Sequence, residues 1–192
     1  EYPYPAAVNE VYEITRWAFT KVREWDVDPK RISIGGFSAG ATITEAVCLK
    51  ANETKEFSVC LQALCYGCFE MYVRPEDKPD AENNLISASR GQAFNLCYCG
   101  GDEALLKEPL CSPGAASDEM LVGMPETLII SAGKDNFRFE NARMAERLML
   151  SGVKVTAKCF LNSNHGFMTH CSAEYEEAQK LLIDTIRQAG TH

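Results

Sequence analysis

Five consecutive residues constrain this chain more than any others: Gly36-Phe37-Ser38-Ala39-Gly40, directly after the apolar run 32–35. An apolar run, a cluster of small residues and a helix-compatible segment predict a strand, a tight turn that holds one serine, and a helix. Side chains at such a turn would collide, and glycine tolerates both close backbone approach and positive φ. We therefore expect Gly36, Ala39 and Gly40 to provide the room in which Ser38 is presented.

The G-x-S-x-G spacing is that of a nucleophilic serine at the top of a strand–turn–helix unit. A helix beginning near Ala39 would direct free backbone N–H groups toward the place where an oxyanion forms, so the N–H of Ala39 is a candidate oxyanion donor. The alternative is a glycine-rich strand–helix turn whose serine has no chemical role. These two interpretations are distinguished by whether the rest of the chain provides partners for the serine.

Hydrophobic periodicity predicts the order of the remaining elements. We expect helices over 8–25, 42–51, 87–99, 139–150 and 172–189, and strands over 31–35, 57–63, 126–132 and 153–160. Residues 74–84 and 109–124 are expected to be irregular. Strands that alternate with helices predict a parallel α/β sheet with crossover helices. The length of 192 residues predicts a single domain, 1–192, with an irregular excursion at about 71–124.

Composition excludes several classes of partner. The chain carries a net charge of −8 without a cluster of Lys or Arg, which argues against nucleic acid and anionic membranes. No apolar run approaches the roughly 20 residues of a membrane span. The cysteine count is odd, which favours free thiols and a cytoplasmic location. The nine cysteines are Cys48, Cys60, Cys65, Cys68, Cys97, Cys99, Cys111, Cys159 and Cys171. A zinc site is the alternative role for four of them. Those four are Cys65, Cys68, Cys97 and Cys99.

A serine nucleophile needs a base and an acid that fixes the tautomer of that base, and both groups should follow strands. Asp135 follows the expected strand 126–132, and His165 follows the expected strand 153–160. Catalytic groups collect at the carboxyl edge of parallel sheets, which favours these two residues. Glu140 is the alternative acid and His170 the alternative base, whereas His192 is the last residue of the chain.

At this point the chain resembles the hormone-sensitive-lipase-like group of α/β-hydrolases, the acetyl esterase/lipase type. The matching stretches are 5–17, 28–40, 102–103, 112–113, 132–135 and 165–167. The resemblance implies Ser38 as nucleophile, His165 as general base, Asp135 as its orienting acid and the Ala39 N–H as an oxyanion donor. It also implies hydrolysis of short-chain carboxylic esters through an acyl-enzyme, with no metal or organic cofactor.

The sequence departs from this family in two respects. Phe37 stands where an acidic residue is frequent, and Ser38 comes early, with no His-Gly-Gly-type loop before it. We therefore expect a C-terminal portion of an α/β-hydrolase, whose open sheet edge is covered by an N-terminal companion fragment or by a homodimer. An inactive binding module of this fold and a serine peptidase of similar fold are the competing interpretations.

Overall fold

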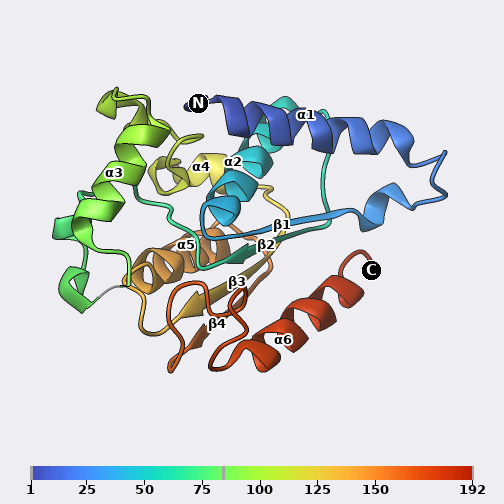
Figure 1. Cartoon of the computed structure of the whole chain (residues 1–192). Coiled ribbons are helices and arrows are strands. Elements are labelled where there is room, and N and C mark those ends of the chain that lie inside the picture. Colours follow the sequence, from blue (N-terminus) through green and yellow to red (C-terminus); the bar gives the residue numbers. More distant parts are fainter. Residues whose placement is uncertain (1, 84, 192) are drawn as a thin grey trace.

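The computed structural model describes residues 2–83 and 85–191 and contains one sheet of four parallel strands (Figure 1). The strands are β1 (Ser33–Phe37), β2 (Leu61–Cys65), β3 (Glu126–Ala132) and β4 (Val155–Phe160), and their order in the sheet follows their order in the chain. Because every neighbouring pair is parallel, all four strands end at the same edge of the sheet. The expected parallel α/β architecture is confirmed.

Helices cover both faces of the sheet. The helices are α1 (Ala6–Lys21), α2 (Ala39–Thr54), α3 (Ala88–Tyr98), α4 (Asp118–Leu121), α5 (Arg138–Leu150) and α6 (Tyr175–Gln188). Of these, α2 and α5 pack on one face of the sheet and α6 packs on the other. Side chains alternate along each strand, so that Leu64 and Ile129 pack toward α2 and α5, while Leu61 and Leu128 pack toward α6. Both faces are therefore buried over the central strands, and this accounts for their nearly continuous apolar sequence.

The strand β3 and the helix α3 begin and end close to where the sequence predicts them. The Ser87 side chain caps α3 by accepting a hydrogen bond from the backbone N–H of Arg90 at 3.4 Å. The prediction for β2 was wrong by four residues at its start, because Phe57 is buried in a loop rather than in the strand. Its ring stacks on Phe19 with centroids 5.3 Å apart and packs on Tyr12 at 5.1 Å, so its apolar character serves contacts with α1.

Other boundaries also differ from prediction, and the largest difference among the helices is that the one expected over 8–25 spans Ala6–Lys21. The strand β1 starts two residues later than expected and includes Phe37, so the small-residue turn begins only at Ser38. The segment 109–124 was expected to be irregular, yet it contains α4, whose four residues are too few to produce a helical hydrophobic period. Within the described residues, no helix is long and apolar enough to cross a membrane.

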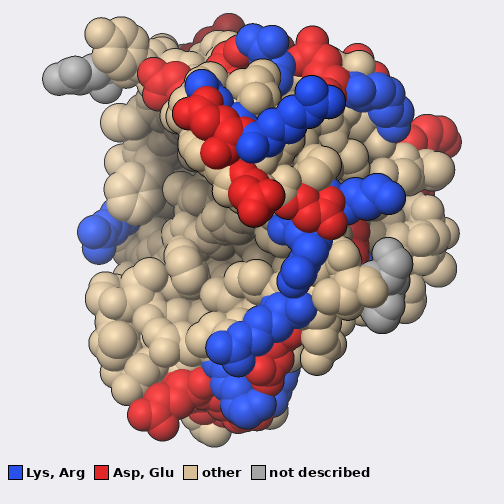
Figure 2. Space-filling view, turned by 90° about the vertical axis from the view of Figure 1, so that its right-hand side faces the viewer, with Lys and Arg blue, Asp and Glu red and all other residues tan. Residues whose placement is uncertain are grey.

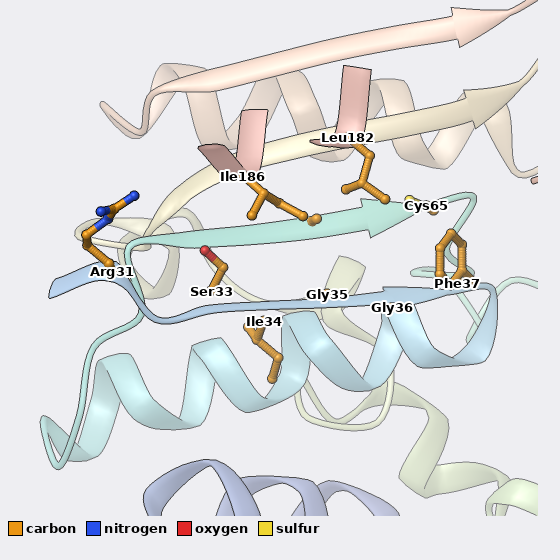
Figure 3. Close-up of a pocket in the computed structure, with 10 residues that line it drawn as sticks. Arg31, Ser33, Ile34, Gly35, Gly36, Phe37, Cys65, Leu182 and Ile186 are labelled. Carbon is orange, nitrogen blue, oxygen red and sulfur yellow. The ribbon is translucent and has the colours of Figure 1, made fainter. Parts of the chain in front are cut away.

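The outer strand of the described sheet, β1, borders an open hollow. A cavity of about 440 Å³ lies along it, between the strand and α6. Leu182 and Ile186 of α6 point toward this cavity from one side, and Gly35 and Gly36 form its floor (Figure 3). The side view shows a hollow whose walls are largely free of charged side chains, while Lys, Arg, Asp and Glu crowd the surface around it (Figure 2).

Candidate active site

Ser38 sits between the end of β1 and the start of α2 in a strained backbone conformation. Its φ of 54° and ψ of −121° lie in a region that residues with a side chain seldom adopt. The Ser38 N–H donates a hydrogen bond to the carbonyl of Cys65 at 2.9 Å, which ties the turn to the end of β2. The surrounding structure thus holds the strained residue in place.

The two glycines of the turn have different roles. A Cβ at Gly36 would overlap the backbone of Gly40, so glycine is required there by close approach. A Cβ at Gly40 would meet nothing within 4 Å. The expectation that Gly40 also provides room was therefore wrong, because α2 turns its backbone, not the Cα hydrogen of Gly40, toward the strand.

Asp135 and His165 follow adjacent strands and are brought together at the carboxyl edge of the sheet. Asp135 lies in the turn between β3 and α5, and His165 lies in the turns after β4. Gly133 permits this approach, because a Cβ at that position would overlap the backbone of Leu161. The backbone N–H of Lys134 donates to the carbonyl of Ser163 at 2.9 Å and joins the two loops directly.

The three side chains form one continuous hydrogen-bonded chain. Ser38 Oγ lies 2.8 Å from His165 Nε2, and His165 Nδ1 lies 2.6 Å from Asp135 Oδ2. Asp135 is completely buried and His165 is only 9% exposed. With its proton on Nδ1, the imidazole donates to Asp135 and accepts the hydroxyl proton of Ser38. This arrangement can take a proton from the serine and return it to a leaving group.

Two aromatic rings surround the imidazole, and the sequence patterns did not predict either contact. Tyr66 meets His165 edge-on with centroids 5.2 Å apart, and Phe137 does so at 5.5 Å. Phe137 also holds the carboxylate, because its backbone N–H donates to Asp135 Oδ1 at 3.1 Å. Each ring follows a strand end by a few residues, which is the only sequence feature that points to them.

The alternative acid and bases lie elsewhere. The Glu140 carboxylate accepts hydrogen bonds from Lys78 Nζ at 3.0 Å and from the backbone N–H groups of Phe69 and Glu70. Among the described residues, the exposed His170 makes no side-chain hydrogen bond. His192 lies outside the described residues.

A pocket of about 480 Å³ opens beside Ser38. Its walls come from α1, α2, α3 and the segment after β2, and none of the lining side chains is charged. They are Ala7, Ser38, Ala39, Thr42, Ile43, Cys68, Met71, Ile86, Gly91, Phe94, Asn95, Tyr98 and Phe137. A site of this size and character accepts an apolar group of a small molecule.

Ala39 is the first residue of α2 and lines the same pocket. Its backbone N–H belongs to the first turn of the helix, where N–H groups have no partner within the helix. The N–H of Ser38 itself is bonded to Cys65 and is therefore unavailable to a ligand. The described chain thus places the N-terminus of α2, which starts at Ala39, next to Ser38, and such an N-terminus favours negative charge.

The four cysteines of the alternative zinc site differ in their exposure. Cys65 and Cys99 are buried, Cys68 is half-buried and Cys97 is exposed, and all nine are free thiols. Among residues 2–83 and 85–191, no three His, Cys, Asp or Glu side chains come together in a way that could hold a metal ion.

The sequence and the fold place this chain among known proteins. It belongs to the alpha/beta hydrolase fold family, whose sequence profile matches residues 1–169. It is 28% identical over 169 residues to the esterase LipI of Mycobacterium tuberculosis, covering 88% of this chain and 52% of the relative. It is also 28% identical over 178 residues to the carboxylesterase NlhH of the same organism, covering 88% and 53%.

A solved esterase structure from Rhizomucor miehei superimposes with a TM-score of 0.88 at 24% identity, over 98% of this chain and 61% of that chain. This likeness supports the fold, and the two curated relatives are named for ester hydrolysis. The chain spans about half the length of those curated relatives.

Proposed function

We propose that this protein hydrolyses carboxylic esters through an acyl-enzyme on Ser38, with Asp135 and His165 as the other members of a catalytic triad. The observation that carries the proposal is the unbroken chain of hydrogen bonds from Ser38 Oγ through His165 to the buried Asp135. The kinship with esterases supports the same reaction. No metal or organic cofactor takes part in this chemistry.

The proposed reaction has two halves. Ser38 Oγ attacks the ester carbonyl carbon while His165 Nε2 takes the hydroxyl proton, and the carbonyl oxygen becomes an oxyanion near the Ala39 N–H. The tetrahedral intermediate collapses, the C–O bond to the alcohol breaks, and His165 returns the proton to the departing alkoxide. Water then attacks the acyl group with His165 again as the base, and this step releases the acid and restores Ser38.

The charge of Asp135 stabilises the imidazolium that forms in each half. It also fixes the tautomer in which Nε2 faces the serine. Burial of the carboxylate strengthens both effects, because the interaction takes place away from water. Asp135 therefore orients and stabilises without transferring a proton.

The substrate we propose is an uncharged ester with a short acyl chain. The pocket beside Ser38 supports an uncharged group, since no Lys, Arg, Asp or Glu lines it. Transfer of a charged group into such a pocket would cost several kcal/mol of desolvation, about the discrimination that separates good from poor substrates.

We further propose that the open edge of β1 is covered in the active protein by an N-terminal companion fragment or by a second copy of the chain. The supporting observation is the cavity of about 440 Å³ along an outer strand whose backbone is available for pairing. The cytoplasmic location suggested by the nine free cysteines also stays a prediction.

Treatment with a fluorophosphonate, followed by intact-protein and peptide mass spectrometry, tests the triad. A single adduct on Ser38, absent from Ser38→Ala and accompanied by loss of ester turnover in that variant, is the expected result. An unreactive Ser38 in folded protein would favour an inactive binding module of this fold. Hydrolysis of amides in preference to matched esters would favour a peptidase.

A further inference from the structure

Lys78 is a buried cation close to the candidate triad, and neither motif nor family likeness assigns it a role. It lies after a short 3₁₀ turn (Pro75–Asp77) in the excursion between β2 and β3, and it is only 8% exposed. Burying an ammonium group is costly unless its proton donors are satisfied. The surroundings of Lys78 therefore call for a physical explanation.

Three partners surround the Lys78 ammonium group, which has three donors. Lys78 Nζ lies 3.0 Å from Glu140 Oε1, 3.6 Å from Cys68 Sγ and 4.8 Å from the centroid of the Phe137 ring. Glu140 is 2% exposed, and its second oxygen accepts the backbone N–H groups of Phe69 and Glu70. The cation thus joins the excursion, the first turn of α5 and the segment after β2.

Phe137 connects this cluster to the triad. One contact of its ring is with the Lys78 cation, and another is with the imidazole of His165, whose centroid lies 5.5 Å away. Its backbone N–H holds Asp135 Oδ1. Phe137 therefore touches two of the three triad residues, and the attraction between Lys78 and its ring restricts the orientation of that ring.

We propose that Lys78 is a positioning residue: through the Phe137 ring it holds His165 and Asp135 in the geometry that the reaction at Ser38 requires. The inference rests on the proposed ester hydrolysis for its kinetic readout. A loose imidazole would spend less time within hydrogen-bonding reach of Ser38 Oγ, and small misplacements of this kind lower rates by up to about 100-fold. Lys78 does not contact the atoms whose bonds form or break in the proposed reaction, and it takes no part in proton transfer.

Two variants of the intact protein separate positioning from stability. Lys78→Met leaves the buried Glu140 unpaired and is expected to weaken folding as well as activity. The double variant Lys78→Met/Glu140→Gln removes both charges, and the glutamine oxygen can still accept the backbone N–H groups of Phe69 and Glu70. We expect the double variant to recover most of the lost stability while kcat per active site stays roughly 10- to 100-fold below wild type.

Active sites are counted by fluorophosphonate titration, so that unfolded protein does not lower kcat. The expected loss falls on kcat, with a much smaller change in KM. Lys78→Arg, which retains the cation, should recover part of the rate. Asp80→Asn is the matched control, because Asp80 pairs with Arg138 on the same two segments but is exposed, and exposed pairs contribute little. Wild-type kcat per site in the double variant would overturn the proposal.

A second readout does not depend on turnover. The chain has three histidines, so the Nδ1 proton of His165 can be assigned by NMR in histidine-labelled protein with His→Gln variants. We expect this resonance to be sharp in wild type and Asp80→Asn, and broadened or shifted in the double variant. An unchanged resonance would refute the positioning role of Lys78, whether or not wild type hydrolyses an ester. A wild type that hydrolyses no ester would refute the proposed function separately.

Discussion

Glu45 is a third buried carboxyl group, beside Asp135 and Glu140, and it gives a quantitative prediction for stability. It lies on α2, is completely buried, and neither of its carboxylate oxygens has a hydrogen-bond partner among the described residues. Burial raises the pKa of Glu45 from 4.5 to about 8, while interactions with Gln62 and Arg147 oppose that rise. Near neutral pH the folded protein therefore holds a proton that the unfolded chain releases.

The sign of the pH dependence follows from this difference. The folded state binds more protons than the unfolded state between pH 4.5 and about 8, so the free energy of unfolding falls as pH rises through that range. From pH 4.5 to pH 7, about 2.5 units at about 1.4 kcal/mol per unit give a loss of about 3 kcal/mol from this one group. The loss should level off above about pH 8, near 5 kcal/mol.

Glu45→Gln removes the titration while keeping size and polarity. We expect the variant to be within about 1 kcal/mol of wild type at pH 5 and about 3 kcal/mol more stable at pH 7. Urea unfolding followed by circular dichroism at pH 5, 6, 7 and 8 measures the difference, in which the other titrating groups cancel. Glu53→Gln, on the exposed side of the same helix, is the matched control and should stay within about 0.5 kcal/mol at every pH. A stability difference between Glu45→Gln and wild type that does not change with pH would refute the reasoning.

Three further variants test the site. Gly36→Ala should destabilise the fold by about 1–3 kcal/mol or more, because its Cβ would overlap the backbone of Gly40. Gly40→Ala should be neutral or should stabilise the fold by up to about 1 kcal/mol, because its Cβ would meet no other atom within 4 Å. Urea unfolding measures both variants, and equal effects would contradict the requirement for glycine at position 36 alone. Asp135→Asn should lower kcat roughly 10⁴-fold with little change in the unfolding midpoint, because the amide favours the wrong tautomer of His165, and a loss under tenfold in a p-nitrophenyl ester assay would remove Asp135 from the triad.

The elements that the sequence predicts well are those with a local cause. The strand β3 is a run of apolar residues bounded by Pro125 and Gly133, and the structure starts and ends it at the expected residues. The predicted start of β2 was wrong because Phe57 is buried by aromatic rings from α1. The contact between Tyr12 and Phe57 spans 45 residues of sequence, and hydrophobic periodicity does not detect it. A buried strand and a loop that packs on a distant helix can have equally apolar sequences, so only the three-dimensional structure distinguishes them.

The candidate site divides in the same way. Ser38, Asp135 and His165 could be named in advance because each lies within five residues after the end of a strand, and parallel strands bring such residues to one edge. Their hydrogen bonds are observed, and their catalytic roles stay predictions. The role of Gly133 also has a sequence indication, since a glycine at the end of a strand indicates a close backbone approach.

Lys78 could not be found in this way, and the reason bears on how the site is held together. It lies in a stretch with two prolines and several acidic residues, whose composition is that of a solvated loop, and its partner Glu140 is 62 residues away in sequence. A buried ion pair between them is worth forming only where other contacts satisfy both groups, and here the Phe137 ring and two backbone N–H groups do so. Because Phe137 also contacts His165, the least predictable part of the excursion is the part that reaches the candidate triad.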